Sequence, residues 1–174
     1  MGLIVHLAEP QDAPAVARVH TASWQHAYRG LLPQKYLDAL SVEARTKTWA
    51  KAFSQLPGQT PTNLVAELDS QIIGFACVGP NRDDKTDTAT CELWGLYLDP
   101  AHWRAGHGHT LHTEALDVAR ASGAAAAILW VLTTNQRARH FYEHHGWAAD
   151  GAEKAVWRGD VRLDETRYRI SLRA

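Results

Sequence analysis

The spacing of apolar residues predicts a strand followed by helices in the first third of the chain. Residues 2–8 form a short apolar run typical of a strand, and residues 11–26 repeat apolar positions at the spacing of one helix face. A Gly-Leu-Leu-Pro stretch then interrupts the pattern. Residues 34–53 predict a second helical region, divided into two pieces near Ser41.

Strand-like runs dominate the middle of the chain. Two β-branched, apolar runs at residues 62–68 and 71–79 are joined by an Asp-Ser pair, and this spacing predicts a tight antiparallel hairpin. Residues 90–98, TCELWGLYL, predict a central strand in which Gly95 is a candidate β-bulge.

The last third of the chain alternates helices and strands. An amphipathic helix follows the Asp-Pro pair after the central strand, and residues 125–132 predict a buried strand. A helix over residues 135–145 is followed by strands at residues 155–157 and 163–172. The order of elements predicts a mixed α/β fold with one sheet, in a single domain over residues 1–174.

Composition narrows the class of protein. The 174 residues are 45% hydrophobic and 21% charged, and the formal charge of -1 gives no general attraction to nucleic acid. Cys77 and Cys91 both lie in strand-like runs, which favours free buried thiols in a reducing compartment. The first ten residues lack a targeting pattern, and no apolar run approaches the roughly 20 residues that span a bilayer. We therefore expect a cytoplasmic protein without a membrane partner.

A glycine-containing loop in residues 96–111, LYLDPAHWRAGHGHTL, gives the first indication of a ligand site. Gly106 and Gly108 stand directly before an amphipathic helix, where unpaired backbone amides and the helix dipole bind phosphate. Basic side chains that can add charge are Arg104, His107 and His109. The loop predicts an anion site, and a glycine loop that only turns the chain remains the alternative at this point.

Two common phosphate loops do not fit this segment. It has no Gly-Lys-Ser/Thr ending, which excludes the loop of nucleoside triphosphatases. The third glycine of a dinucleotide loop is absent, and the next strand ends in Thr133-Thr134-Asn135 rather than in an acid.

A second motif, NQRARHFYEHHGW at residues 135–147, follows the loop. Together the two segments resemble the GNAT superfamily of N-acetyltransferases. The family's loop reads Gln/Arg-x-x-Gly-x-Gly/Ala after a strand and a proline, and its later helix reads Asn-x-x-Ala-x-x-Phe-Tyr-x-x-x-Gly-Phe. The resemblance covers residues 62–172 and implies an acyl-CoA N-acyltransferase fold, a mostly antiparallel sheet of about seven strands flanked by helices. Trp103 departs from the pattern, since the family has Gln or Arg there.

The resemblance implies acetyl-CoA as co-substrate. Its pantetheine arm would pair with the edge of a strand that splays from its neighbour, and its pyrophosphate would sit on the loop amides. The residues implied to bind it are Leu96, Tyr97, Leu98, Arg104, Ala105, Gly106, His107, Gly108, His109, Asn135 and Tyr142.

The implied reaction moves the acetyl group to a primary amine of a small molecule or peptide by direct attack in a ternary complex. Tyr142 is the candidate acid for the leaving thiolate, because a phenol with a pKa of about 10 holds its proton at neutral pH. A packed core tyrosine is the alternative. Glu92, in an otherwise apolar strand, is either the base that relays the amine proton or half of a structural ion pair.

Aromatic residues are candidates for the acceptor pocket, where their faces can hold a cationic amine. They are Trp24, Tyr28 and Trp94. With seven tryptophans in the chain, packing alone is the alternative for some of them. The acceptor itself carries no motif.

Other functions receive less support. Ten histidines include His140 and His144 one turn apart, but no third ligand accompanies them, so we expect no metal. A nucleic-acid-binding domain would need a basic surface that these scattered arginines do not supply. A non-catalytic acetyl-CoA sensor or regulatory module is the alternative function, and the resemblance makes a homodimer possible.

Overall fold

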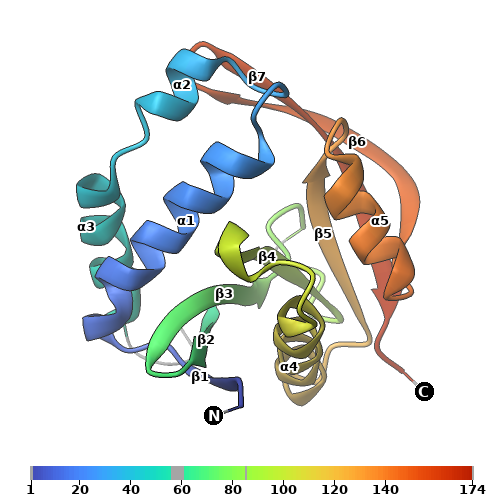
Figure 1. Cartoon of the computed structure of the whole chain (residues 1–174). Coiled ribbons are helices and arrows are strands. Elements are labelled where there is room, and N and C mark those ends of the chain that lie inside the picture. The colour runs from blue at the N-terminus through green and yellow to red at the C-terminus, as the bar shows by residue number, and fades with distance from the viewer. Residues whose placement is uncertain (1, 56–60, 85, 174) are drawn as a thin grey trace.

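The computed structural model describes residues 2–55, 61–84 and 86–173 (Figure 1). The elements in chain order are β1 Ile4–Leu7, η1 Pro10–Asp12, α1 Ala13–Ala27, α2 Gln34–Asp38, α3 Val42–Phe53, β2 Thr62–Leu68, β3 Gln71–Pro80, β4 Thr90–Leu98, η2 Pro100–His102, α4 His107–Ala121, β5 Ala126–Leu132, α5 Gln136–His144, β6 Ala148–Arg158 and β7 Val161–Ser171. The two η elements are short 3₁₀ helices.

The strands of the described residues form one seven-stranded sheet in the order β1-β2-β3-β4-β5-β7-β6. Neighbouring strands are antiparallel except for β4 and β5, which run parallel. The predicted mixed, mostly antiparallel sheet flanked by helices is therefore confirmed. Asp69 and Ser70 form the predicted hairpin turn between β2 and β3, with φ angles of 49° and 64° that match the twist of the strands.

Helices cover both faces of the sheet. Consecutive strand residues point to opposite sides, so an apolar run exposes apolar side chains on both faces, and each face is buried under helices. On one face, Val16 of α1 packs against Val65 and Phe75. On the other, Leu111 of α4 packs in one cluster with Leu64. Leu64 and Val65 are neighbours in β2, so alternation within a single strand supplies both cores. Burying each such side chain contributes about 1.5–3 kcal/mol.

The last hairpin is longer than the apolar pattern predicts. β6 covers residues 148–158, whereas the sequence indicates only residues 155–157. Most of β6 is exposed, so its first half lacks the apolar alternation by which a strand is recognised. Its hydrogen bonds to β7 hold it in the sheet, with a register shift between Ala149 and Glu153.

Candidate functional site

The parallel strands β4 and β5 separate after three residue pairs. They pair only where Thr90 to Glu92 meet Ala126 to Ile128. Directly afterwards β4 bulges: Cys77 of β3 pairs with Gly95 and Val78 pairs with Leu93, so Trp94 is the extra residue. A bulge bends its strand, and here it turns β4 away from β5. The bulge is at Trp94, one residue before the predicted Gly95, which pairs with Cys77, and it lies beside the point where the sheet opens.

A cavity of about 980 Å³ occupies this opening, and we name it the larger cavity. Its walls come from the end of α1, the second half of β4, the loop before α4, the end of β5 and the start of α5. Nine of the eleven residues expected to bind the co-substrate line this cavity: Leu96, Tyr97, Leu98, Arg104, Gly106, Gly108, His109, Asn135 and Tyr142. Ala105 and His107 do not line it.

The loop before α4 presents a row of free amides. Gly106 is the N-cap of α4 with φ 84°, and Arg104 also has a left-handed backbone with φ 63°. None of the amides from Arg104 to Gly108 donates a hydrogen bond to an acceptor among the described residues. A Cβ on Gly108 would lie 3.2 Å from Leu98 Cδ1, so glycine lets the helix start pack closely on β4. The loop therefore presents free amide donors at the start of a helix, an arrangement that suits an anion.

Trp103 fastens this loop to the strand. Its indole Nε1 donates to the backbone oxygen of Leu98 at 3.0 Å, and Ser23 of α1 donates to the same oxygen. The guanidinium of Arg137, from α5, lies 3.4 Å from the centre of the Trp103 ring and lines the larger cavity. Arg137 has no ion-pair partner among the described residues. Sequence reasoning missed Arg137, although its place inside the second motif was a signal.

Tyr142 lies at the inner end of the larger cavity. Its side chain is buried, and its hydroxyl makes no hydrogen bond to another described residue. Burial raises the pKa of the Tyr142 phenol well above its usual value, so the group stays protonated at neutral pH. Asn135 caps α5 by accepting from the Ala138 amide at 3.2 Å, which fixes its side chain at the cavity wall.

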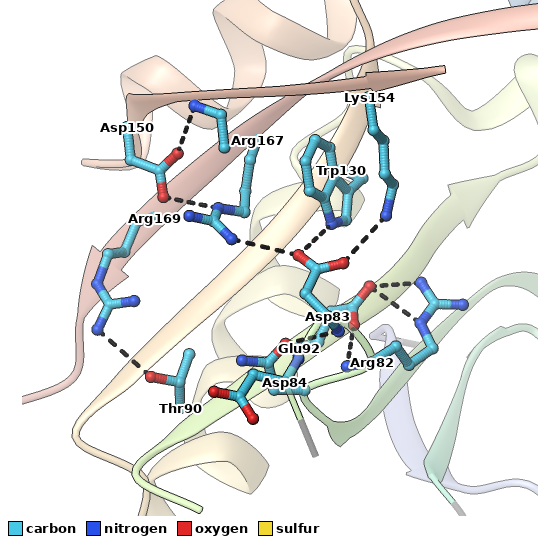
Figure 2. Close-up of polar contacts among 12 residues, drawn as sticks. Arg82, Asp83, Asp84, Thr90, Glu92, Trp130, Asp150, Lys154, Arg167 and Arg169 are labelled. Carbon is cyan, nitrogen blue, oxygen red and sulfur yellow. Dashed lines mark hydrogen bonds and ion pairs between the residues drawn. The ribbon is translucent and has the colours of Figure 1, made fainter. Parts of the chain in front are cut away.

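Glu92 takes part in the ion pair that was one of its two predicted roles. Its side chain is fully buried and accepts from Arg82 Nε at 3.0 Å and from the Arg82 backbone amide at 2.9 Å. Figure 2 shows that two nitrogens of the Arg82 guanidinium contact the same carboxylate oxygen of Glu92. Glu92 lines neither cavity described here. The structure thus provides the structural pair, and a direct role as base stays a prediction.

A smaller cavity of about 320 Å³ adjoins the first, between the end of α1, the bulge of β4 and one face of β5, β7 and β6. The three aromatic residues predicted for the acceptor, Trp24, Tyr28 and Trp94, all line it. Four residues line both cavities and so form their common wall; they are Tyr28, Trp94, Tyr97 and Trp130.

The histidines do not gather into a metal site among residues 2–55, 61–84 and 86–173, where no group of three or more His, Cys, Asp or Glu could hold a metal ion. His140 and His144 are exposed. His109 and His145 contact each other through Nδ1 and Nε2 at 3.0 Å. No helix of the described residues is long and apolar enough to cross a membrane.

Known proteins resemble this chain in sequence and in fold. The model of the acetyltransferase (GNAT) family matches residues 21–147. A probable N-acetyltransferase of Mycobacterium tuberculosis is 29% identical over 170 residues, covering 95% of this chain and 92% of that protein. The crystal structure of the PaiA N-acetyltransferase from Thermoplasma acidophilum, in complex with coenzyme A, has a TM-score of 0.80 at 20% identity and covers 98% of this chain and 99% of its own. The YncA structure from Salmonella typhimurium, a putative acetyltransferase with acetyl-CoA, has a TM-score of 0.74 at 20% identity and covers 100% of this chain and 96% of its own.

Proposed function

The chain belongs to the acetyltransferase (GNAT) family and is an acyltransferase that uses acetyl-CoA, and we propose that it acetylates a primary amine by direct attack in a ternary complex. The observation that carries this proposal is the pair of adjoining cavities. A donor in the larger cavity and an acceptor in the smaller one would meet at their common wall, beside Tyr97 and Trp94. Holding two reactants in contact replaces a bimolecular encounter and removes much of its entropic cost.

The larger cavity fits an extended, phosphate-bearing thioester. The free amides from Arg104 to Gly108 would hold the pyrophosphate, and Arg137 supplies an unpaired positive charge nearby. The edge of β4 at Leu96 and Tyr97 has no strand partner on the side of β5 and offers backbone groups to the pantetheine arm, and Asn135 lines the same cavity. These residues therefore provide contacts for both the pyrophosphate and the pantetheine arm of acetyl-CoA.

The reaction requires that the amine lose its proton before attack and that the departing thiolate gain one. The nitrogen attacks the thioester carbonyl, the carbon–sulfur bond breaks, and the electron pair leaves on sulfur. We assign Tyr142 as the acid that protonates this sulfur, since its phenol carries a proton at neutral pH and lines the larger cavity. A backbone amide near Leu96 is the candidate donor to the developing oxyanion.

The proton of the amine needs an acceptor. Glu92 is the candidate from the sequence, but its carboxylate is held in the ion pair with Arg82. Both carboxylate oxygens of Glu92 are occupied, so a direct transfer has no open route. If Glu92 acts as a base, it must do so through water, because the guanidinium of Arg82 does not give up its proton.

The remaining parts of the proposal concern the setting of the protein. The two cysteines of the described residues, Cys77 and Cys91, are free, buried thiols, and burial raises their pKa values to about 12 and about 11. Because free thiols persist in a reducing compartment, we propose a cytoplasmic location. We also propose one domain over residues 1–174 and leave a homodimer as a possibility for measurement of mass in solution.

The test is thiol release from acetyl-CoA with a panel of amines that includes amino acids, polyamines, aminoglycosides and peptides. We expect turnover with at least one class, and Tyr142→Phe should lower kcat by about 100-fold while acetyl-CoA affinity changes little. Tyr168→Phe is the control, because that hydroxyl bonds to Glu143 and Arg139 away from the cavities. Acetyl-CoA binding without thiol release for any acceptor would favour the sensor and overturn the proposal.

A further inference from the structure

The charged residues of the smaller cavity fall into two groups, according to whether the protein already neutralises them. Three of its five charged side chains are paired. Arg82 pairs with Glu92, and Asp83 pairs with Lys154 at 3.3 Å. Arg167 and the Trp130 indole also donate to Asp83, so its carboxylate is held on three sides (Figure 2). This network joins the loop after β3 to β6 and β7 and forms one wall.

Glu165 and Arg158 are the other two charged residues. Neither side chain makes a hydrogen bond or an ion pair to another described residue, although both line the cavity. Glu165 of β7 is opposite Lys154 of β6 and Leu132 of β5, which sets its side chain on the cavity face of the sheet. A partly buried carboxylate without a partner loses solvation and is stabilised by a cationic ligand.

The two unpaired charges lie at different depths. Burial raises the pKa values of Tyr28 and Tyr97, and the nearby charge of Glu165 adds to both effects. Because Tyr28 and Tyr97 belong to the common wall of the cavities, Glu165 lies on the side where the acetyl group would arrive. Arg158 lies at the end of β6, next to the turn into β7, and is exposed. Of the two charges without a hydrogen-bonded partner, Glu165 therefore lies toward the common wall and Arg158 toward the exposed end, while the charges of Lys154, Arg158 and Arg82 also act on Glu165.

The rest of the lining is apolar or aromatic. Leu32, Leu132, Val156 and Leu163 contribute aliphatic surface, and Trp24 adds an aromatic face. The volume of about 320 Å³ lies at the lower end of the range of roughly 300–1,000 Å³ that is usual for ligand pockets. Such a pocket suits a small acceptor better than a long or highly charged one.

We propose that the acceptor is a free amino acid with an apolar side chain, bound with its α-amino group toward Glu165 and its α-carboxylate toward Arg158. This inference rests on the proposed acetyltransferase function and names the substrate class of the same site. The two charges of the ligand match the two unpaired charges of the cavity in sign and order, and the side chain of the ligand packs on the apolar wall. The free amine then faces the common wall, where the acetyl group is transferred.

The decisive comparison uses leucine and leucinamide as acceptors, because they differ only in the group that would meet Arg158. Leucinamide has the less basic amine and therefore more free base at neutral pH, so amine reactivity alone favours leucinamide. We expect kcat/KM for leucine to exceed that for leucinamide by about tenfold, the factor that corresponds to about 1.4 kcal/mol of binding. Equal values, or a preference for leucinamide, would overturn the proposal.

Substitutions of Arg158 and Glu165 test which charge of the cavity binds which charge of the amino acid. Arg158→Gln should bring the ratio of leucine to leucinamide close to one, whereas Arg162→Gln should leave it unchanged, because Arg162 pairs with Asp164 and lines neither cavity. Glu165→Gln should weaken both acceptors. Calorimetry of leucine with the CoA-bound protein gives a readout without turnover, and Glu165→Gln should lower that affinity as well.

The outcomes separate this inference from the proposed function. Turnover of polyamines or aminoglycosides but not of amino acids would keep the acetyltransferase and reject the amino-acid acceptor. An unchanged leucine to leucinamide ratio in Arg158→Gln would also reject it. No turnover with any amine would reject the proposed function, and the acceptor assignment with it.

Discussion

The guanidinium of Arg137 lies 3.4 Å from the centre of the Trp103 ring, a cation–π contact between α5 and the loop before α4. Trp103 occupies the loop position where the family has Gln or Arg. Helix α5 therefore adds a positive charge at this end of the larger cavity, beside that of Arg104, and the tryptophan serves as the platform that holds it.

Arg137→Ala should weaken the binding of acetyl-CoA by about tenfold, because a charge-assisted hydrogen bond to phosphate contributes about 1.5–3 kcal/mol. Trp103→Leu should have a smaller effect in the same direction, since Arg137 keeps its charge but loses its platform. Calorimetric titration with CoA measures both. Arg120→Ala is the control, because Arg120 pairs with Asp117 at the far end of α4. Unchanged affinity in Arg137→Ala would mean that Arg137 does not contact the ligand.

Gly106→Glu should abolish CoA binding, because a carboxylate at the N-cap of α4 would repel the phosphates and occupy the anion site. Gly123→Glu is a closely matched control. Gly123 lies after the other end of the same helix, has φ 83° against 84° for Gly106, and like Gly106 has no neighbour within 4 Å of a built Cβ. Both changes impose similar backbone strain, so only the effect on the anion site differs. Comparable loss of binding in both variants would point to misfolding rather than to a blocked site.

Arg82→Leu should lower the free energy of unfolding by about 3 kcal/mol, since it leaves the fully buried carboxylate of Glu92 without its ion-pair partner. Urea denaturation measures the change. Lys47→Ala removes an exposed pair with Glu43 and should cost less than about 0.5 kcal/mol.

The pH profile of Glu92→Gln tests whether Glu92 has a role in catalysis. For Glu92→Gln we expect the acid limb of the kcat/KM profile to persist, because Glu92 lines neither cavity. Disappearance of that limb would instead support Glu92 as the base.

His112 should make the protein less stable at acid pH. Its Nε2 accepts from the Trp147 indole at 2.8 Å, and burial, with His145 nearby, lowers its pKa from 6.5 to about 4. Between these two values the unfolded chain binds a proton that the folded chain does not. The stability contributed by neutral His112 is therefore present above pH 6.5 and lost as the pH falls toward 4, by about 3 kcal/mol.

Urea denaturation at several pH values tests this dependence. His112→Gln removes the titrating group and should flatten the profile between pH 6.5 and 4. Buried His20, whose pKa burial lowers to about 3, will leave some of the slope in place. The exposed His144→Gln should reproduce the wild-type profile, and a His112→Gln profile equal to the wild type would contradict the assignment.

Elements whose cause is local can be predicted from the amino-acid sequence. The hairpin at Asp69 and Ser70 follows from a two-residue connection, the break at Ser41 from its cap on Ala44, and the anion loop from the glycines before α4. Each depends on backbone conformation or hydrogen bonding within a few residues. The sheet and the walls of the larger cavity were likewise predictable once the two motifs indicated the family.

Contacts between side chains far apart in the sequence depend instead on the tertiary structure. The pairing of Arg137 with Trp103, the burial of Glu92 under Arg82, and the position of Glu165 near Tyr97 depend on strand register and helix packing. A shift of one residue in β7 would turn Glu165 to the opposite face of the sheet. No local pattern in the chain records that register, because the hydrogen bonds and packing of many residues set it together.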